Sequence, residues 1–247
     1  MLLKCQIALI IILLVSCKSE TISENKTIVI LYDLSSSTNN GSRAKYIENT
    51  QLIINDLQPG DELVCEAITD KSVREKSIIH KLVSDPFQAT TTNKIGKSAQ
   101  ENKAQKEFEA KRTQANLQIA QFIADTLQQF PQTDIFSALT LVRTVYDNFP
   151  NSKQVLIIMS DMLVSDNKYQ FEKNTPTKEQ TLAIIEALKK QSMMPNLAET
   201  TIYVVGADAG SNEKYYGIRS FWQTYFIATG TELPENKYSA HLLHFDE

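Results

Sequence analysis

Short runs of β-branched and aliphatic residues constrain the fold of this chain more than any other feature. The runs are Thr27–Tyr32 (TIVILY), Gln154–Met159 (QVLIIM) and Thr201–Val205 (TIYVV), and Glu62–Ile68 (ELVCEAI) has a related pattern. Unbroken apolar runs of this length are typical of strands that are buried on both faces of a parallel sheet. Such a sheet buries its two faces only when helices cover both of them.

Apolar stripes at helical spacing lie between and after these runs. Residues that begin or end helices flank the stripes. They are Pro59-Gly60 and Pro150 after the first and second stripes, Pro176 at the first position of a third helix, and Ser211 or Asn212 before a fourth helix that Gly230 closes. Strands that alternate with helices predict a single α/β domain over residues 27–247, a doubly wound, mostly parallel sheet with helices on both faces.

One segment, about residues 84–112, interrupts this alternation. It contains three consecutive threonines and a charged run rich in Lys, Gln and Glu. Its continuation carries Ala115, Ile119, Phe122 and Phe130 at helical spacing. We therefore expect an inserted loop that leads into a long amphipathic helix whose first turns are solvated.

The amino-terminal segment has the pattern of an export signal. Lys4 precedes an apolar run that ends at Ser16 and Cys17. The run is shorter than the roughly 20 residues that a membrane-spanning helix needs, and its length fits a signal peptide. The sequence Leu-Val-Ser-Cys at its end resembles the lipobox of bacterial lipoproteins. The resemblance implies that residues 1–16 are removed, that Cys17 is acylated, and that 17–26 form the lipidated cysteine and its tether.

This interpretation places the protein in the bacterial cell envelope, outside the cytoplasm, with a lipid anchor in a membrane. Acylation of Cys17 would leave Cys65 without a partner thiol in the mature chain, which excludes an intramolecular disulfide. The formal net charge of −4 argues against nucleic acid as a partner, because phosphate binding needs a basic surface.

Hydroxyl and carboxylate side chains follow two of the predicted strands. The segment from Asp33 to Ser37 (DLSSS) follows the first apolar run, and Ser160-Asp161 follows another. Thr133 stands just before the helix that leads into that second strand. Ligands of open parallel sheets bind outside the carboxyl ends of the strands, so we expect these side chains to form the functional site.

Asp33-x-Ser35-x-Ser37, followed later by Thr133 and Asp161, resembles the metal ion-dependent adhesion site of the von Willebrand factor A family. The resemblance implies that Ser35, Ser37 and Thr133 ligate a metal directly, and that Asp33 and Asp161 act through water or from close by. Oxygen donors favour Mg²⁺ or Mn²⁺, with Ca²⁺ also possible. The open coordination positions would accept an acidic residue of a protein partner.

One departure from the family concerns the residues before the threonine. Family members often have glycines there, and this chain has Pro131-Gln132. Thr133 is therefore either a metal ligand or only the N-cap of its helix, with Asp134 in the first turn.

Two other functions compete with adhesion. One is a scaffold domain that keeps the fold but binds no metal. The other is a metal-dependent hydrolase or phosphatase with Asp33 as nucleophile. Phosphatases of the haloacid dehalogenase type need a second aspartate two residues after the nucleophile, and this chain has Ser35 at that position. The G-x-S-x-G motif that carries the nucleophilic serine of other hydrolases is also missing. We therefore expect a binding protein and not an enzyme.

Overall fold

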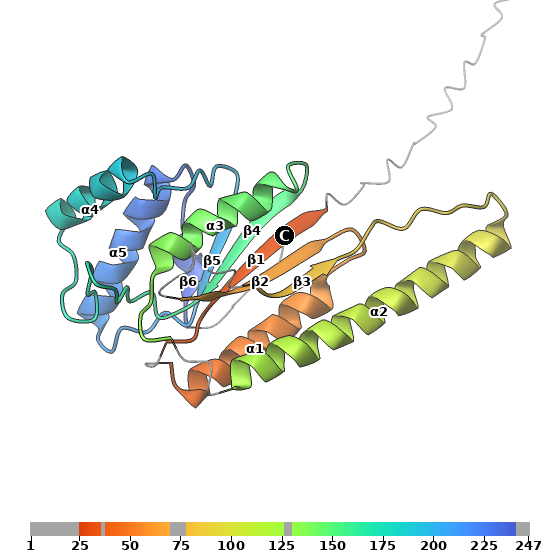
Figure 1. The fold of residues 1–247 in the computed structure, drawn as a ribbon, viewed down its shortest axis with the longest axis horizontal. Helices are drawn as coiled ribbons and strands as arrows, with labels where there is room; N and C mark the ends of the chain where they lie inside the picture. The colour runs from red at the N-terminus through yellow and green to blue at the C-terminus, as the bar shows by residue number, and fades with distance from the viewer. Residues whose placement is uncertain (1–24, 36–37, 70–77, 126–129, 241–247) are drawn as a thin grey trace, which may run out of the picture.

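The computed structural model describes residues 25–35, 38–69, 78–125 and 130–240. Within these residues, a six-stranded sheet runs through the centre of the molecule (Figure 1). Its strand order is β3-β2-β1-β4-β5-β6, and every neighbouring pair is parallel except β2 and β3. The strands are β1 (Lys26–Asp33), β2 (Glu62–Ile68), β3 (Ile78–Val83), β4 (Lys153–Met159), β5 (Thr201–Val205) and β6 (Tyr238–Ser239).

The four strands that the sequence predicts are all present, with bounds that match within one residue. β1 lies at the middle of the sheet and pairs with β2 on one side and β4 on the other. Residues 27–33 are all buried, which explains why the run has no polar alternation. The sequence does not predict β3, the antiparallel edge strand, or the two-residue β6.

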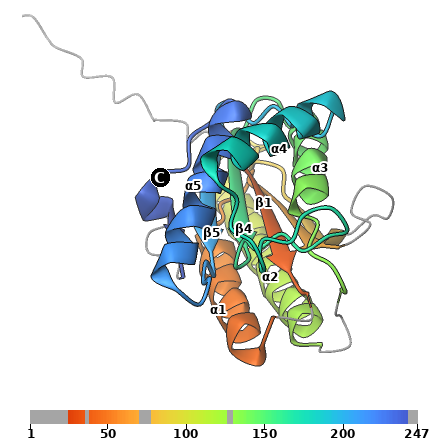
Figure 2. The ribbon, with the colours of Figure 1, turned by 90° about the vertical axis from the view of Figure 1, so that its left-hand side faces the viewer.

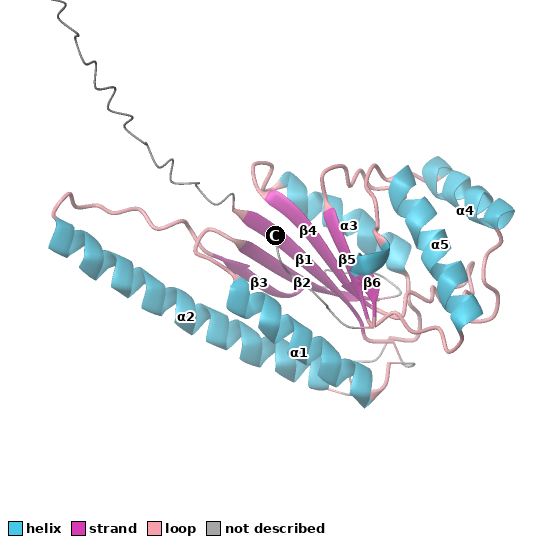
Figure 3. Ribbon diagram, turned by 180° about the vertical axis from the view of Figure 1, so that it is seen from behind, coloured by secondary structure: helices cyan, strands magenta, loops and turns pink. Residues whose placement is uncertain are grey.

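Helices form a layer on each face of the sheet (Figures 2 and 3). One layer contains α1 (Asn40–Asp56) and α2 (Lys94–Ala124), and the other contains α3 (Ile135–Asp147), α4 (Lys178–Lys190) and α5 (Asn212–Ala228). A single turn of 3-10 helix, η1 (Glu235–Lys237), precedes β6. The predicted fold class, a doubly wound and mostly parallel α/β sheet with helices on both faces, is therefore confirmed.

Alternate residues of each strand enter two separate cores, because successive side chains of a strand point to opposite faces. Val29 and Leu31 pack with α3, α4 and α5, whereas Ile28 and Ile30 pack with α1 and α2. The aromatic residues of α5 belong to the first core, where the ring of Trp222 lies 5.4 Å from that of Phe136 between centroids. These aromatic stripes are core, as the sequence predicts.

The helix ends correct two predictions and confirm two. Thr177 caps α4 through a capping box with Gln180, so Pro176 lies before the cap and not at the first helical position. Phe130 does not continue α2, which ends at Ala124, but forms an isolated bridge with Ser35. The ends of α5 are as predicted. Ser211 is its N-cap, and Gly230 follows its C-cap with φ of 94°.

The segment at about 84–112 forms a loop and the first turns of α2. This helix has 31 residues, and Phe108 is the first of them that is buried. Its amino-terminal turns extend beyond the sheet (Figure 1). The expectation of a long helix with solvated first turns is thus met.

The predicted acylation site at Cys17 and most of the tether lie outside the described residues. In the part of the chain that is described, no helix combines the length and apolarity needed to cross a membrane. Cys65 is a buried free cysteine on β2, and burial raises the pKa of its thiol to about 12.

Candidate functional site

Strands β1 and β4 bring Asp33 and Ser160 together at the carboxyl edge of the sheet. Tyr32 lies opposite Met159 in the parallel register, so the residues that follow them lie side by side. The Ser160 hydroxyl donates a hydrogen bond to Asp33 Oδ2 over 2.8 Å. Both residues are buried, with 2% of Asp33 and none of Ser160 exposed. The two central strands therefore position Asp33 and Ser160.

Ser35 lies within the turn that follows β1. Its backbone N–H donates to Asp33 Oδ1 over 3.0 Å, and its side chain is buried. Leu34, the residue before Ser35, accepts a hydrogen bond at its carbonyl oxygen from the Phe130 N–H over 3.3 Å. Ser37, the third residue of the predicted motif, lies outside the described residues.

Thr133 reaches the same carboxylate from a different segment. Its hydroxyl lies 3.5 Å from Asp33 Oδ1, to which it donates. A two-way backbone pairing with Ser165 fixes its position, with N···O distances of 2.9 and 3.3 Å. Asp134, not Thr133, is the N-cap of α3, and its carboxylate accepts from the Ser137 N–H. The N-cap interpretation of Thr133 is therefore wrong, and its hydroxyl faces the site.

Asp161 follows Ser160 and is less buried than Asp33. Its Oδ1 accepts a hydrogen bond from the Leu163 N–H over 2.9 Å. The intervening Met162 has φ of 65°, an uncommon conformation for a residue with a side chain, which turns the chain sharply after β4. In this position the Asp161 carboxylate is within range of the Asp33 charge.

The two aspartates repel one another in a desolvated site. Burial and the Asp33 charge raise the pKa of Asp161 to about 7, while the Leu163 N–H and the Lys214 ammonium oppose the increase. Burial raises the pKa of Asp33, against the hydrogen bonds from Ser35, Ser160 and Thr133. Two carboxylates that repel one another in a desolvated site favour a bound cation, or a proton on one of them.

Tyr46 and Gly206 complete the surroundings of the site, and the motif does not include them. The Tyr46 ring is buried, and the nearby charges of Asp33 and Asp161 add to the effect of burial in raising the pKa of its phenol. Gly206 has φ of 95°, and a Cβ there would lie 3.1 Å from the Tyr46 ring and 3.4 Å from the Ser160 carbonyl oxygen. A side chain at this position would therefore strain the backbone and crowd the site.

Sequence reasoning missed Tyr46 and Gly206 as parts of the site. The sequence predicts Ser160 at this edge because it stands next to Asp161 at a strand end, but the motif gives it no role and does not predict its hydrogen bond to Asp33. Tyr46 lies in a helical stripe that indicates only core, and Gly206 follows β5 in a glycine-containing turn. Neither position carries a local pattern that points to Asp33.

Comparison with solved structures finds similar chains, among them a von Willebrand factor type A protein from Catenulispora acidiphila. Its solved structure is 14% identical in sequence, covers 85% of this chain and 44% of its own, and has a TM-score of 0.36. This chain thus spans less than half the length of that protein. No protein-family model and no curated protein matches the sequence.

The donor atoms fit a hard divalent cation. Asp33, Ser35, Thr133 and Asp161 offer carboxylate and hydroxyl oxygens, which Mg²⁺ and Mn²⁺ prefer. In the described part of the chain, no three His, Cys, Asp or Glu side chains gather in a group that could hold a metal. An ion here would therefore depend on two carboxylates together with hydroxyls and water, and it would stabilise the charged forms of Asp33 and Asp161.

Proposed function

We propose that this chain is a membrane-anchored protein-binding module that holds Mg²⁺ or Mn²⁺ at Asp33, Ser35, Ser37, Thr133 and Asp161. The observation that carries the proposal is the pair of carboxylates, Asp33 and Asp161, at the carboxyl edge of the sheet. The Thr133 and Ser160 hydroxyls donate to Asp33, and the charge of Asp33 raises the pKa of Asp161. Such a pair is electrostatically costly unless a cation or a proton is present.

Asp33 would organise the hydroxyl ligands. It accepts hydrogen bonds from the Ser35 N–H and from the Thr133 and Ser160 hydroxyls. A hydroxyl that donates its proton to a carboxylate directs its lone pairs elsewhere, so the Thr133 oxygen remains able to ligate a metal. Asp33 thereby sets the orientation of a neutral ligand while supplying charge from close by.

The partner would bind through an acidic residue. Octahedral Mg²⁺ takes six oxygens, and three hydroxyl ligands leave positions for water or for an incoming carboxylate. Because only Asp33 and Asp161 supply formal charge, the ion would stay electrophilic toward a third carboxylate. In this proposal the metal and its ligands position a partner for binding, and no bond of the partner is broken.

The anchor belongs to the same proposal. Acylated Cys17 would attach the protein to a membrane of the bacterial cell envelope, outside the cytoplasm, with the segment before β1 as tether. β1 begins at Lys26 and ends at Asp33, so a tether before Lys26 and a metal at Asp33 would be at opposite ends of this strand. Eight strand residues span about 25 Å, which would place the site on the side away from the lipid.

The test is a calorimetric titration of the full-length chain in detergent with Mg²⁺, Mn²⁺ and Ca²⁺ after chelation. We expect Mg²⁺ or Mn²⁺ to bind at one site, and Asp33→Asn and Ser35→Ala to abolish the binding. Thr27→Ala is the control, because Thr27 is a buried hydroxyl residue at the other end of β1. Water-proton relaxation by bound Mn²⁺ would report the open coordination positions.

Two outcomes would contradict the proposal. If the folded wild-type chain binds none of the three ions at millimolar concentration, the domain is a scaffold that keeps the fold without the metal. If Asp33→Asn and Thr27→Ala bind the metal as the wild type does, the ion binds elsewhere in the molecule.

A further inference from the structure

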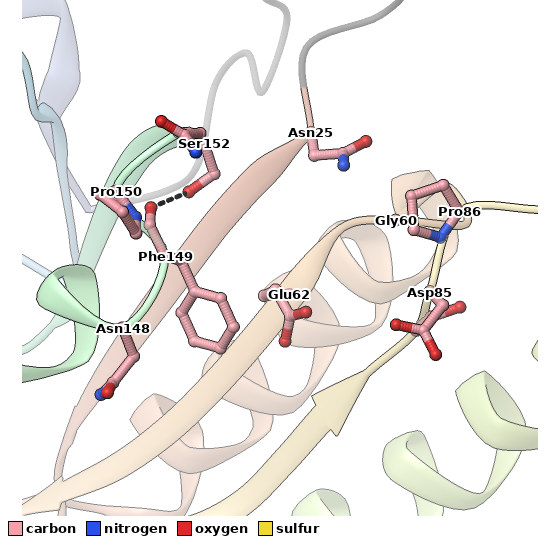
Figure 4. Close-up of a pocket in the computed structure, with 11 residues that line it drawn as sticks. Asn25, Gly60, Glu62, Asp85, Pro86, Asn148, Phe149, Pro150 and Ser152 are labelled. Atoms are coloured by element: carbon pink, nitrogen blue, oxygen red, sulfur yellow. Dashed lines mark hydrogen bonds between the residues drawn. The ribbon is translucent and has the colours of Figure 1, made fainter.

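A cavity of about 270 Å³ opens at the amino-terminal edge of the sheet, opposite the candidate metal site (Figure 4). It lies between the end of β3, the start of β2 and the turn that joins α3 to β4. Polar and apolar groups both line it, including the side chains of Asn25, Glu62, Asp85, Pro86, Phe149 and Pro150. None of these residues belongs to the site around Asp33.

Glu62 is the feature of this cavity that points to a ligand. Its side chain lies between the Phe149 ring and Asp85 in Figure 4, and only 9% of the residue is exposed. Within the described part of the chain, its Oε2 atom has no hydrogen-bond partner. A buried, unpartnered carboxylate oxygen is costly, so a bound donor would stabilise this arrangement.

The charges around Glu62 are mostly acidic. Burial raises the pKa of Glu62 to about 7, and Asp85 and Asp61 act in the same direction while Lys81 opposes them. Asp61 is already engaged, since its carboxylate accepts the N–H groups of Lys26 and Gln58 over 2.8 and 2.9 Å. Asp85 and Glu62 are therefore the acidic groups that line the cavity, and they favour a cation inside it.

The Phe149 ring favours an organic cation over a metal ion. The Lys81 ammonium lies 5.1 Å from the centroid of this ring, so a cationic group is already accommodated against the ring, and the carbon atoms of a ligand can contact the part of it that lines the cavity. Two hydrogen bonds hold the backbone of the turn between α3 and β4. The Ser152 hydroxyl donates to the Phe149 carbonyl oxygen over 2.8 Å, and the Phe149 N–H donates to the Tyr146 carbonyl oxygen over 2.9 Å. Pro86 and Pro150 add apolar wall that a hydrated metal ion would not use.

We propose that this cavity binds a small organic molecule through a primary ammonium group, which donates hydrogen bonds to Glu62 while the attached carbon atoms contact Phe149. Asp85 adds negative charge on the opposite wall. Asn25 lies on the cavity rim directly before β1, so in an anchored protein the opening would face the side from which the tether comes. The ammonium could therefore belong to a free amine or to an ethanolamine headgroup of a lipid.

Calorimetry on the full-length chain in a non-ionic, amine-free detergent at pH 8 tests the proposal. Ethanolamine is expected to bind at millimolar concentration, and the neutral ethylene glycol at least about tenfold more weakly. Glu62→Gln should weaken ethanolamine binding at least about tenfold, because it keeps the shape of the side chain and removes its charge. Glu66→Gln is the matched control, since Glu66 lies on the same strand and face with an equally unpartnered Oε2, outside the cavity lining.

Glycerophosphoethanolamine distinguishes the two sources of the ammonium group. Tighter binding than ethanolamine assigns the cavity to a lipid headgroup, and weaker binding assigns it to a free amine, because the phosphate would meet Glu62 and Asp85. The proposal is overturned if ethylene glycol binds as well as ethanolamine, or if no ethanolamine binds at concentrations on the order of 50 mM. Equal loss of affinity in Glu62→Gln and Glu66→Gln would also overturn it. None of these results depends on the metal site.

Discussion

At the scale of single residues, Asp33 connects three separate segments of the chain. Its carboxylate accepts from the Ser35 N–H in its own turn, from Thr133 before α3 and from Ser160 after β4. The bond from Ser35 is local to its turn, whereas those from Thr133 and Ser160 join residues 100 and 127 positions apart that only the folded sheet brings together. The geometry of the candidate site therefore depends on complete folding of the two central strands.

Glu66 provides a prediction about pH. Burial raises its pKa from 4.5 to about 7, so the folded protein binds a proton here that the unfolded chain has already released. The native state holds more protons between these two values, and its stability falls as the pH rises through that window. We expect Glu66→Gln to raise the free energy of unfolding by roughly 2 to 3 kcal/mol at pH 8 and by almost nothing at pH 4.

Urea unfolding of the two proteins at several pH values between 4 and 8 measures this difference. Glu48→Gln, a substitution of an exposed glutamate on α1, is the control and should change stability little at any pH. A gain for Glu66→Gln that is as large at pH 4 as at pH 8 would show that packing, and not ionisation, is responsible.

The residues of the site could be predicted only where they belong to a spaced motif. Asp33, Ser35, Thr133 and Asp161 carry such spacing, and the structure brings at least Asp33, Ser35 and Thr133 into direct contact. The contact of Ser160 with Asp33 and the position of Tyr46 could not be predicted in this way, because they depend on which strand lies beside β1 and which helix covers it. That information is held in the register of β1 with β4, not in local sequence.

At the scale of elements, α4 begins at a capping box. The Thr177 hydroxyl accepts from the Gln180 N–H, and the Gln180 side chain accepts in return from the Thr177 N–H, over 3.3 and 2.9 Å. Two amide groups that the helix leaves unpaired are satisfied by this exchange. The cap, and not the fixed backbone of the proline before it, decides where the helix starts.

Removal of the cap should lower stability by a measurable amount. We expect Thr177→Ala to reduce the free energy of unfolding by about 1 kcal/mol, as N-cap hydroxyls do elsewhere. The urea midpoint measures the loss, and Thr177→Ser should retain most of the stability because it keeps the hydroxyl. Equal losses in both variants would mean that the threonine methyl group, and not the cap, carries the effect.

The central strands could be predicted from sequence because both of their faces are buried, which leaves an unbroken apolar run. Strand β3 lacks this signal. It lies at the sheet edge, where Ile78 and Val83 expose 47% and 40% of their surface and the remaining residues are mixed in polarity. The prediction that Phe130 belongs to the long helix was wrong because apolar residues at helical spacing continue in the sequence beyond the point where α2 ends.

At the scale of the whole molecule, metal binding and folding should be coupled. The proposed ligands come from the turn after β1 and from two segments about a hundred residues or more further along the chain, so the unfolded chain cannot present them together. At a metal concentration a hundredfold above the dissociation constant, binding contributes about 2.7 kcal/mol to stability. We expect saturating Mg²⁺ or Mn²⁺ to raise the melting temperature by roughly 5 to 10 °C, and chelation to reverse the rise.

Differential scanning calorimetry with and without chelator measures the shift, and Ser35→Ala is the variant that should lose it. If the metal raises the melting temperature of Ser35→Ala as much as that of the wild type, the effect is a general one of salt and does not arise at the site.

The position of β1 has a mechanical consequence. Under the proposed anchoring, a pull between a bound partner and the membrane enters at Asp33 and leaves at Lys26, along the length of one strand. That strand is paired over seven positions with β2 and over seven with β4. Such a load shears both ladders at once and does not open them one hydrogen bond at a time. Strand β1 would thus carry the tension between the membrane and the partner.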